Sequence, residues 1–264
     1  MTAVQARSLL FVPGDRPDRF EKAVASGADA VILDLEDAVA PGAKSDALGH
    51  VLSWLEHRSG AVVRVNAAGT PWHAAEIAAL ARTDALVMVP KADASADLAM
   101  IRSVVGDRIV ALIETARGLR SADEVCAAPG VVRVALGNVD LARELGVDPD
   151  SHAAMSYARG RVIAAAAAAG IAAPIDGVTT KLDSPEALAR DLVVTRELGF
   201  GGKLCIHPRQ VADVNDALRP TPDELDWARR IMEHAATGGV SVVGGVMVDP
   251  PVLARAAALL QRER

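Results

Sequence analysis

The chain has 264 residues, of which 51% are hydrophobic and 23% charged, and its 34 acidic side chains outnumber 28 basic ones to give a formal net charge of −6. This balance is typical of a globular protein, and it argues against nucleic acid as a partner because DNA and RNA binding depends on positive charge. The two cysteines, Cys126 and Cys205, lack the paired spacing of a zinc ribbon. The apolar run at the N-terminus is too short for a signal peptide, and no stretch is long enough to span a membrane. We therefore expect a cytoplasmic protein that binds neither nucleic acid nor membrane.

Short apolar runs recur along the chain, and each is followed by a segment with helical spacing. The runs begin at Ser8, Ala30, Ala61, Ala85, Arg108, Val131, Ala173 and Gly201. Runs rich in Val, Ile and Leu with little alternation indicate strands that are buried on both faces, as in a parallel sheet. Eight strand–helix units within about 210 residues predict a (β/α)8 TIM barrel rather than an open doubly wound sheet.

The chain continues beyond the last predicted strand. A helix is expected to begin near Thr221, with Pro222 in its first turn, and a glycine-rich piece, TGGVSVVGGVMVDPP, leads into a last helix from Val252. An earlier alanine-rich stretch, YARGRVIAAAAAAG, also predicts a helix, because alanine is the best helix former. We expect residues 1–220 to form the barrel. Residues 221–264 would form a helical extension that can cover the barrel mouth or reach a neighbouring subunit.

Polar side chains stand at or just after the end of every predicted strand. In chain order they are Asp15 and Arg16, Asp34, Glu36 and Asp37, Arg64 and Asn66, Lys91, Glu114, Asn138 and Asp140, Asp176, and His207. Barrel enzymes carry their catalytic groups at the C-terminal ends of the strands, and buried charges are costly unless they are paired or bound to a metal. This pattern predicts an active site, with a network of structural ion pairs as the alternative.

Two of these carboxylates, Glu114 and Asp140, end neighbouring strands and would repel each other unless one is protonated or a cation lies between them. Magnesium commonly takes one or two protein carboxylates and completes its shell with water and substrate oxygens. We therefore expect a Mg2+ site here, the alternative being two unrelated surface carboxylates. Arg64 on the third strand can hold a substrate carboxylate through a bidentate contact, or pair with Asp34 or Glu36.

Three basic positions have two interpretations each. Arg16 and Lys22 are spaced to clamp a phosphate, although a solvated helix face explains them equally well. For His207 we favour a structural over a catalytic role. The segment around Arg16 has neither a dinucleotide-binding glycine pattern nor a P-loop, and no serine or cysteine nucleophile motif appears in the sequence.

The motifs RSLLFVPGDRPDRFEKA, VILDLEDAV, VVRVN, VMVPKA, LIETARG, LCIHPRQ and GVMVDPPVL appear in this order between Arg7 and Leu253. With them the sequence resembles the citrate lyase beta-subunit-like (CitE-like) branch of the HpcH/HpaI aldolase family, which is related to malyl-CoA and citramalyl-CoA lyases. The resemblance implies a (β/α)8 fold, a Mg2+ cofactor and a homotrimer or a dimer of trimers. It also implies reversible carbon–carbon cleavage of a β-hydroxyacyl-CoA ester, such as malyl-, citramalyl- or citryl-CoA, into an acyl-CoA and an α-keto acid.

The resemblance also implies roles for single residues. Glu114 and Asp140 match the two metal ligands, and Arg64 matches the arginine that holds the keto-acid carboxylate. Asp249 matches an aspartate that acts as acid and base in the active site of an adjacent subunit. The implied contacts to the CoA phosphates are Arg16 and Lys22, and the residues expected to support the catalytic groups are Asp34, Glu36 and Asp37.

The sequence departs from the family pattern in one motif, because the family's GAED reads Gly137-Asn138-Val139-Asp140 here. The metal-binding aspartate is kept, but valine replaces the preceding glutamate, which bears on metal affinity or substrate choice. Three other functions therefore stay open. They are a malyl-CoA-type thioesterase, a metal-dependent aldolase acting on free hydroxy-keto acids, and a non-catalytic CoA-binding subunit.

Overall fold

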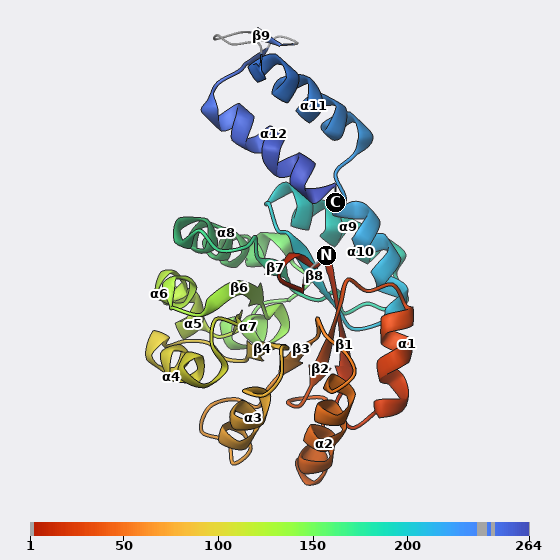
Figure 1. The fold of residues 1–264 in the computed structure, drawn as a ribbon, viewed down its shortest axis with the longest axis vertical. Coiled ribbons are helices and arrows are strands. Elements are labelled where there is room, and N and C mark those ends of the chain that lie inside the picture. The colour runs from red at the N-terminus through yellow and green to blue at the C-terminus, as the bar shows by residue number, and fades with distance from the viewer. Residues whose placement is uncertain (1–2, 237–241, 244–245, 264) are drawn as a thin grey trace. The chain divides into compact units, whose positions relative to one another are not determined.

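The computed structural model describes residues 3–236, 242–243 and 246–263, and the chain divides into two compact units, Met1–Ala217 and Leu218–Arg264 (Figure 1). The first unit is a closed barrel of parallel strands, β1 to β8, in sequential order, with β1 paired to β8. The strands are β1 (Ser8–Pro13), β2 (Ala30–Asp34), β3 (Val62–Arg64), β4 (Leu86–Val89), β5 (Ile109–Ile113), β6 (Val131–Leu136), β7 (Ile175–Asp176) and β8 (Gly202–Cys205). The predicted (β/α)8 barrel is confirmed.

Helices connect the strands around the outside of the barrel (Figure 1). The α-helices are α1 (Phe20–Ala25), α2 (Lys44–Leu55), α3 (His73–Leu80), α4 (Ser95–Val105), α5 (Ala116–Arg120), α6 (Ala122–Ala127), α7 (Asn138–Leu145), α8 (His152–Ala169), α9 (Pro185–Glu197) and α10 (Val211–Ala217). Short 3-10 turns are η1 (Ala3–Gln5), η2 (Pro17–Arg19), η3 (Pro41–Ala43) and η4 (Pro208–Gln210). The alanine-rich stretch lies in α8, as predicted.

The barrel interior is filled by every second residue of the strands. The buried cluster includes Leu9, Ala30, Ile32, Val62, Met88, Val110, Leu112, Ala135, Ile175 and Leu204. Side chains alternate between the two faces of a strand, so a residue two positions beyond an inward one also points inward. This phase carries Asp34, Arg64 and Glu114 into the interior at the C-terminal end of the barrel.

Asp176 corrects the expectation that every polar strand end faces the barrel mouth. Its neighbour Ile175 points inward, so Asp176 faces the helices and is fully buried. There it pairs with Arg159 at 3.0 Å and lies 3.8 Å from Lys203, while the Thr195 hydroxyl donates to it at 2.6 Å. Burial alone would raise the pKa of Asp176, but the two cations outweigh burial and hold it below its usual value.

The second unit pairs two helices, α11 (Pro222–Ala236) and α12 (Pro250–Arg262), and contains two short antiparallel strands, β9 (Val242–Val243) and β10 (Val246–Met247). The helices pack through a small core of Ala228, Ile231, Val248 and Ala256. Thr221 caps α11 as expected: its hydroxyl accepts from the Glu224 amide, and the Glu224 carboxylate accepts from the Thr221 amide. Residues 237–241 and 244–245, which belong to the glycine-rich piece and include Gly245 of the GVMVDPP motif, lie outside the described residues.

In the described part of the chain, no helix is both long enough and apolar enough to cross a membrane.

Replacing Asp176 with asparagine tests the buried ion network without creating a cavity. Because Arg159 loses its buried partner, we expect Asp176→Asn to lower the free energy of unfolding by about 3 kcal/mol or more in urea titrations. The matched control is Asp123→Asn, which breaks an ion pair with Arg161 at the surface. The Asp123 side chain is 64% exposed. That variant is expected to lose less than about 1 kcal/mol. Equal losses in both variants would contradict a structural role for Asp176.

Candidate functional site

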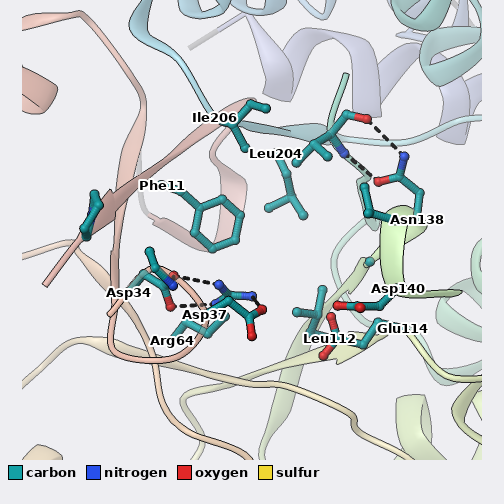
Figure 2. Close-up of a pocket in the computed structure, with 15 residues that line it drawn as sticks. Phe11, Asp34, Asp37, Arg64, Leu112, Glu114, Asn138, Asp140, Leu204 and Ile206 are labelled. Carbon is teal, nitrogen blue, oxygen red and sulfur yellow. Dashed lines mark hydrogen bonds and ion pairs between the residues drawn. The ribbon is translucent and has the colours of Figure 1, made fainter. Parts of the chain in front are cut away.

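A cavity of about 430 Å³ opens at the C-terminal ends of the barrel strands (Figure 2). Its lining consists of Phe11, Pro13, Asp34, Asp37, Ala38, Arg64, Leu112, Glu114, Gly137, Asn138, Val139, Asp140, Val178, Leu204 and Ile206. The cavity thus brings together five of the charged positions that the sequence placed at strand ends, namely Asp34, Asp37, Arg64, Glu114 and Asp140. It lies entirely within the barrel unit.

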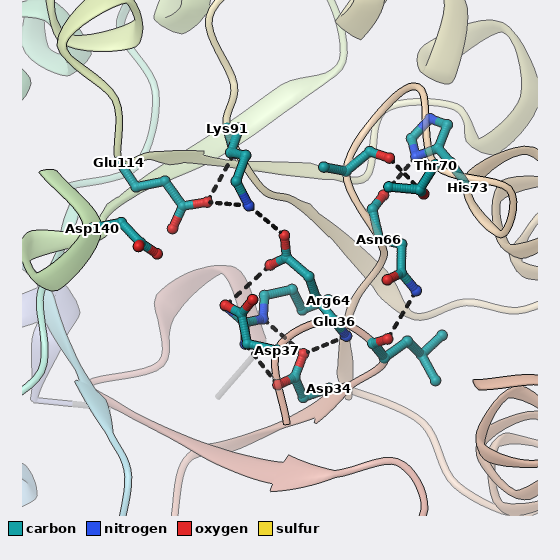
Figure 3. A network of polar contacts seen from close by, with 12 residues as sticks. Asp34, Glu36, Asp37, Arg64, Asn66, Thr70, His73, Lys91, Glu114 and Asp140 are labelled. Atoms are coloured by element: carbon teal, nitrogen blue, oxygen red, sulfur yellow. Dashed lines mark hydrogen bonds and ion pairs between the residues drawn. The ribbon is translucent and has the colours of Figure 1, made fainter. Parts of the chain in front are cut away.

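Glu114 and Asp140 lie in this cavity with their carboxylates side by side, as Figures 2 and 3 show. Glu114 directly follows β5 and its side chain is only 3% exposed, whereas Asp140 stands in the first turn of α7 and pairs with Arg143 at 3.0 Å. Gly137 permits this arrangement, because a Cβ at that position would lie 2.4 Å from the Cβ of Glu114.

The start of α7 is held in place by Asn138. Its amide oxygen accepts from the Val178 backbone at 2.8 Å, and its amide nitrogen donates to the Val178 carbonyl at 3.0 Å. Gly177 makes room for this contact, since a Cβ there would lie 2.1 Å from the Asn138 oxygen. The paired hydrogen bonds orient the turn that carries Asp140.

Arg64 makes the pairing contacts that the sequence allowed as an alternative. Asp34 lies opposite Arg64 in the register of β2 and β3, and its carboxylate accepts two hydrogen bonds from the guanidinium at 2.7 and 2.6 Å. The remaining nitrogen lies 3.3 Å from Glu36 and 3.2 Å from Asp37, and the guanidinium stacks over the Phe11 ring. Asp34 and Glu36 are buried, but the Asp37 side chain is 60% exposed. An incoming carboxylate can therefore take the place of Asp37 beside Arg64.

Lys91 belongs to the site although the sequence analysis gave it no role. It is the one non-glycine residue with positive φ, at 50°, among the residues described. In this strained conformation its backbone amide donates to Glu114 at 2.9 Å, and its ammonium group contacts Glu36 at 2.6 Å and lies 3.9 Å from Glu114 (Figure 3). No sequence pattern marks a lysine for a left-handed backbone, so this contact could be found only in the structure.

The site holds more negative than positive charge. Five carboxylates, on Asp34, Glu36, Asp37, Glu114 and Asp140, face three cations, on Arg64, Lys91 and Arg143. Burial and the nearby Glu36 raise the pKa of Glu114 to about 7, and burial also raises the pKa of Glu36. A divalent cation would remove this excess, and the donors beside the cavity are oxygens, which suits Mg2+ rather than zinc. The described residues contain no group of three or more His, Cys, Asp or Glu side chains that could hold a metal, but Mg2+ needs only one or two carboxylates.

Besides Glu36, which contacts Arg64 from outside the cavity lining, several predicted or considered residues lie away from that lining. Arg16 is exposed and pairs with Asp18 at 3.2 Å, and Lys22 is exposed on α1. His207 caps η4 by accepting from the Arg209 amide at 3.1 Å, which agrees with the favoured structural role. Asp249 belongs to the second unit, where its carboxylate caps α12 by accepting from the Val252 amide at 3.0 Å.

The sequence did not predict which apolar residues line the cavity. Phe11, Leu112, Val178, Leu204 and Ile206 form it. The sequence offered a signal for three of them, since Phe11, Leu112 and Leu204 share the inward phase of their strands. Residues of this kind are expected in any barrel core, and only the structure shows which of them border the open cavity.

Comparison with known proteins agrees with this architecture. Residues 7–208 match the family model described as HpcH/HpaI aldolase/citrate lyase. The chain is 38% identical over 261 residues to a citrate lyase subunit beta-like protein of Mycobacterium tuberculosis, covering 96% of this chain and 94% of that protein. It is 37% identical over 257 residues to a (3S)-malyl-CoA thioesterase of Cereibacter sphaeroides, covering 92% of this chain and 89% of the relative.

Solved structures give the same result. The CitE protein of M. tuberculosis in complex with magnesium, acetoacetate and coenzyme A matches with a TM-score of 0.81 and 36% identity, covering 97% of both chains. A citrate lyase beta subunit of the same organism, complexed with oxaloacetate and magnesium, matches with a TM-score of 0.74 and 36% identity, covering 83% of this chain and 100% of that one. Because the family model and these relatives match most of its sequence and its barrel, the chain belongs to the HpcH/HpaI aldolase/citrate lyase family.

Proposed function

We propose that the chain is a Mg2+-dependent carbon–carbon lyase that cleaves, or forms, a β-hydroxyacyl-CoA ester to give an acyl-CoA and an α-keto acid. The observation that carries the proposal is the pair of neighbouring carboxylates, Glu114 and Asp140, in one cavity with Arg64. A related CitE protein binds magnesium, acetoacetate and coenzyme A, a combination that fits these groups.

In this proposal Glu114 and Asp140 hold Mg2+, which, when bound, supplies a Lewis acid for the keto-acid oxygens. Arg64 binds the carboxylate of the keto acid in place of the exposed Asp37. Asp34 holds the guanidinium in a fixed plane through its two hydrogen bonds, so the arginine is oriented before the substrate arrives. Glu36 and Lys91 complete the charged network that positions Glu114 and Arg64.

The proton transfer is assigned to Asp249. In condensation this carboxylate would remove a proton from the carbon next to the thioester carbonyl, and in cleavage it would return the proton to the same carbon. The assignment rests on the resemblance of the GVMVDPP motif, and it entails a homotrimer or dimer of trimers in which a neighbouring copy provides Asp249. Arg16, which follows β1 at the end of the barrel where the cavity opens, and Lys22 on α1 would bind the CoA phosphates.

A second candidate, hydrolysis of a malyl-CoA-type thioester, is favoured by the 37% identity to the malyl-CoA thioesterase of C. sphaeroides. The same cavity would serve, with water attacking the thioester carbonyl in place of carbon–carbon cleavage. The two reactions differ in their products, because hydrolysis releases free CoA without a keto acid.

The test is a cleavage assay with malyl-CoA, citramalyl-CoA, citryl-CoA and hydroxymethylglutaryl-CoA in the presence of Mg2+, with the keto acid trapped as it forms. We expect a keto acid from at least one ester and loss of the reaction in EDTA. Free CoA without keto acid would replace the lyase by the thioesterase. No turnover of any ester would refute both.

Magnesium binding should depend on pH through Glu114. Its pKa of about 7 means that the metal-free carboxyl is largely protonated at pH 6 and ionised at pH 8. Since Mg2+ must displace that proton, we expect about tenfold tighter binding at pH 8 than at pH 6 by calorimetry. Without metal, the folded protein holds the Glu114 proton more tightly than the unfolded chain does. The free energy of unfolding therefore falls as pH rises from 4.5, the ordinary pKa of a glutamate, to about 7, the pKa of Glu114 in the fold.

Two variants check the assignment of this pH dependence. Glu114→Gln should bind Mg2+ weakly at both pH values. Glu144→Gln, which alters an exposed carboxylate on the same helix as Asp140, should bind as the wild type does. An unchanged affinity in Glu114→Gln would contradict its role as a ligand.

Asp249→Asn separates proton transfer from structure. Asparagine caps a helix as well as aspartate does, so α12 keeps its N-terminus and the fold its stability. We expect turnover to fall by at least about 100-fold, with Mg2+ affinity unchanged. The control Asp226→Asn removes an exposed carboxylate from the same unit and should keep full activity. Full activity in Asp249→Asn would exclude it as the acid and base.

A further inference from the structure

The cavity is divided into a polar and an apolar side. Figure 2 shows the charged groups of Asp34, Asp37, Arg64, Glu114 and Asp140 on one side, and the side chains of Phe11, Leu204 and Ile206 on the other. The charged residues come from the ends of β2, β3, β5 and β6, and the apolar ones come from β1 and β8. A ligand that turns its oxygens to the polar side therefore has its carbon chain against the apolar side.

Two apolar side chains of the lining are open to solvent. Val139 is 43% exposed and Ile206 is 40% exposed, although both border the cavity. Exposed apolar groups in a concave site gain most when a ligand covers them with an apolar group of its own. Val139 directly precedes Asp140, so it stands beside the carboxylates that face the substrate oxygens.

Among the residues that line the cavity, no cation is free to neutralise a second carboxylate on the keto acid. The cations of the site are already engaged: Arg64 with Asp34, Glu36 and Asp37, Lys91 with Glu36, and Arg143 with Asp140. Placing another carboxylate against Val139 and Ile206 would remove its hydration without a partner. A keto acid with only a hydrogen atom in place of that carboxylate would leave the side chains of Val139 and Ile206 exposed to water.

We propose that the α-keto acid of this enzyme carries an alkyl side chain, as pyruvate and 2-oxobutanoate do, and that Val139 is a specificity-determining residue for that chain. This inference rests on the proposed function, because it concerns the keto acid handled by the same cavity. It excludes glyoxylate, which has only hydrogen at this position, and oxaloacetate, which carries a second carboxylate, as preferred substrates.

The first experiment measures condensation of acetyl-CoA with glyoxylate, pyruvate, 2-oxobutanoate and oxaloacetate in the presence of Mg2+. We expect kcat/KM for the better of the two alkyl acids to exceed the values for glyoxylate and oxaloacetate by at least about tenfold, the discrimination that one methylene group allows in an apolar pocket. A preference for glyoxylate or oxaloacetate would overturn the inference.

The second experiment changes the polarity of the cavity lining at Val139 with little change in shape. Val139→Thr replaces a methyl group by a hydroxyl, and we expect it to reduce the preference for 2-oxobutanoate over glyoxylate by roughly tenfold. The matched control is Leu145→Thr, because Leu145 lies on the same helix with the same 43% exposure but outside the cavity lining. This control should keep the wild-type preference. An equal effect of both substitutions, or no effect of Val139→Thr, would show that Val139 does not set the choice.

A binding measurement distinguishes failure of this inference from failure of the proposed function. Calorimetry with Mg2+ and each keto acid, without CoA, reports the preference of the cavity when no reaction takes place. One outcome would support the inference and refute the lyase. In it the wild type binds the alkyl acids more tightly than the other acids, Val139→Thr weakens that binding, and no condensation or cleavage occurs. Condensation without an alkyl preference would support the lyase and refute the inference.

Discussion

The mouth of the barrel concentrates carboxylates that its own cations do not fully neutralise, and the arrangement of the site follows from this constraint. Glu114 is buried near Glu36, which raises its pKa to about 7, and the adjacent Asp140 adds further negative charge. Arg64 offsets part of this charge through Asp34, and Lys91 offsets part through Glu36. The negative charge that remains suits a divalent cation bound through oxygen atoms, which agrees with the magnesium found in related CitE structures.

Holding these charges close together requires an unusual backbone around them. Gly137 and Gly177 stand where a side chain would collide with Glu114 and Asn138, and Lys91 adopts a left-handed conformation that directs its amide to Glu114. Such conformations cost free energy and persist only where the surrounding structure enforces them. Among the described residues, the one non-glycine residue with a left-handed backbone is therefore found beside a proposed metal ligand.

The same kinds of residues serve a different purpose on the other side of the barrel wall. Asp176, Arg159 and Lys203 form a fully buried network between strands and helices, whereas Asp34 and Arg64 face the cavity. The difference depends only on strand phase, because Asp176 lies one residue after the inward-facing Ile175 and Asp34 lies two after the inward-facing Ile32. In the sequence both residues stand at strand ends, and that position alone does not tell which face of the strand each side chain takes.

Local pattern was sufficient to predict the fold from the sequence by itself. Buried strands and amphipathic helices alternate in lengths that leave few architectures, and the capping box of Thr221 and Glu224 is a contact between near neighbours. The cavity also gathers Glu114, Asp140 and Arg64, which were predicted because the strands of a parallel barrel end on one side. Only the tertiary structure decided that Arg64 is already paired, that Lys91 supports Glu114, and that Val139 and Ile206 border the cavity. Those features depend on backbone conformation and on side chains brought together from distant strands, and one-dimensional spacing contains neither.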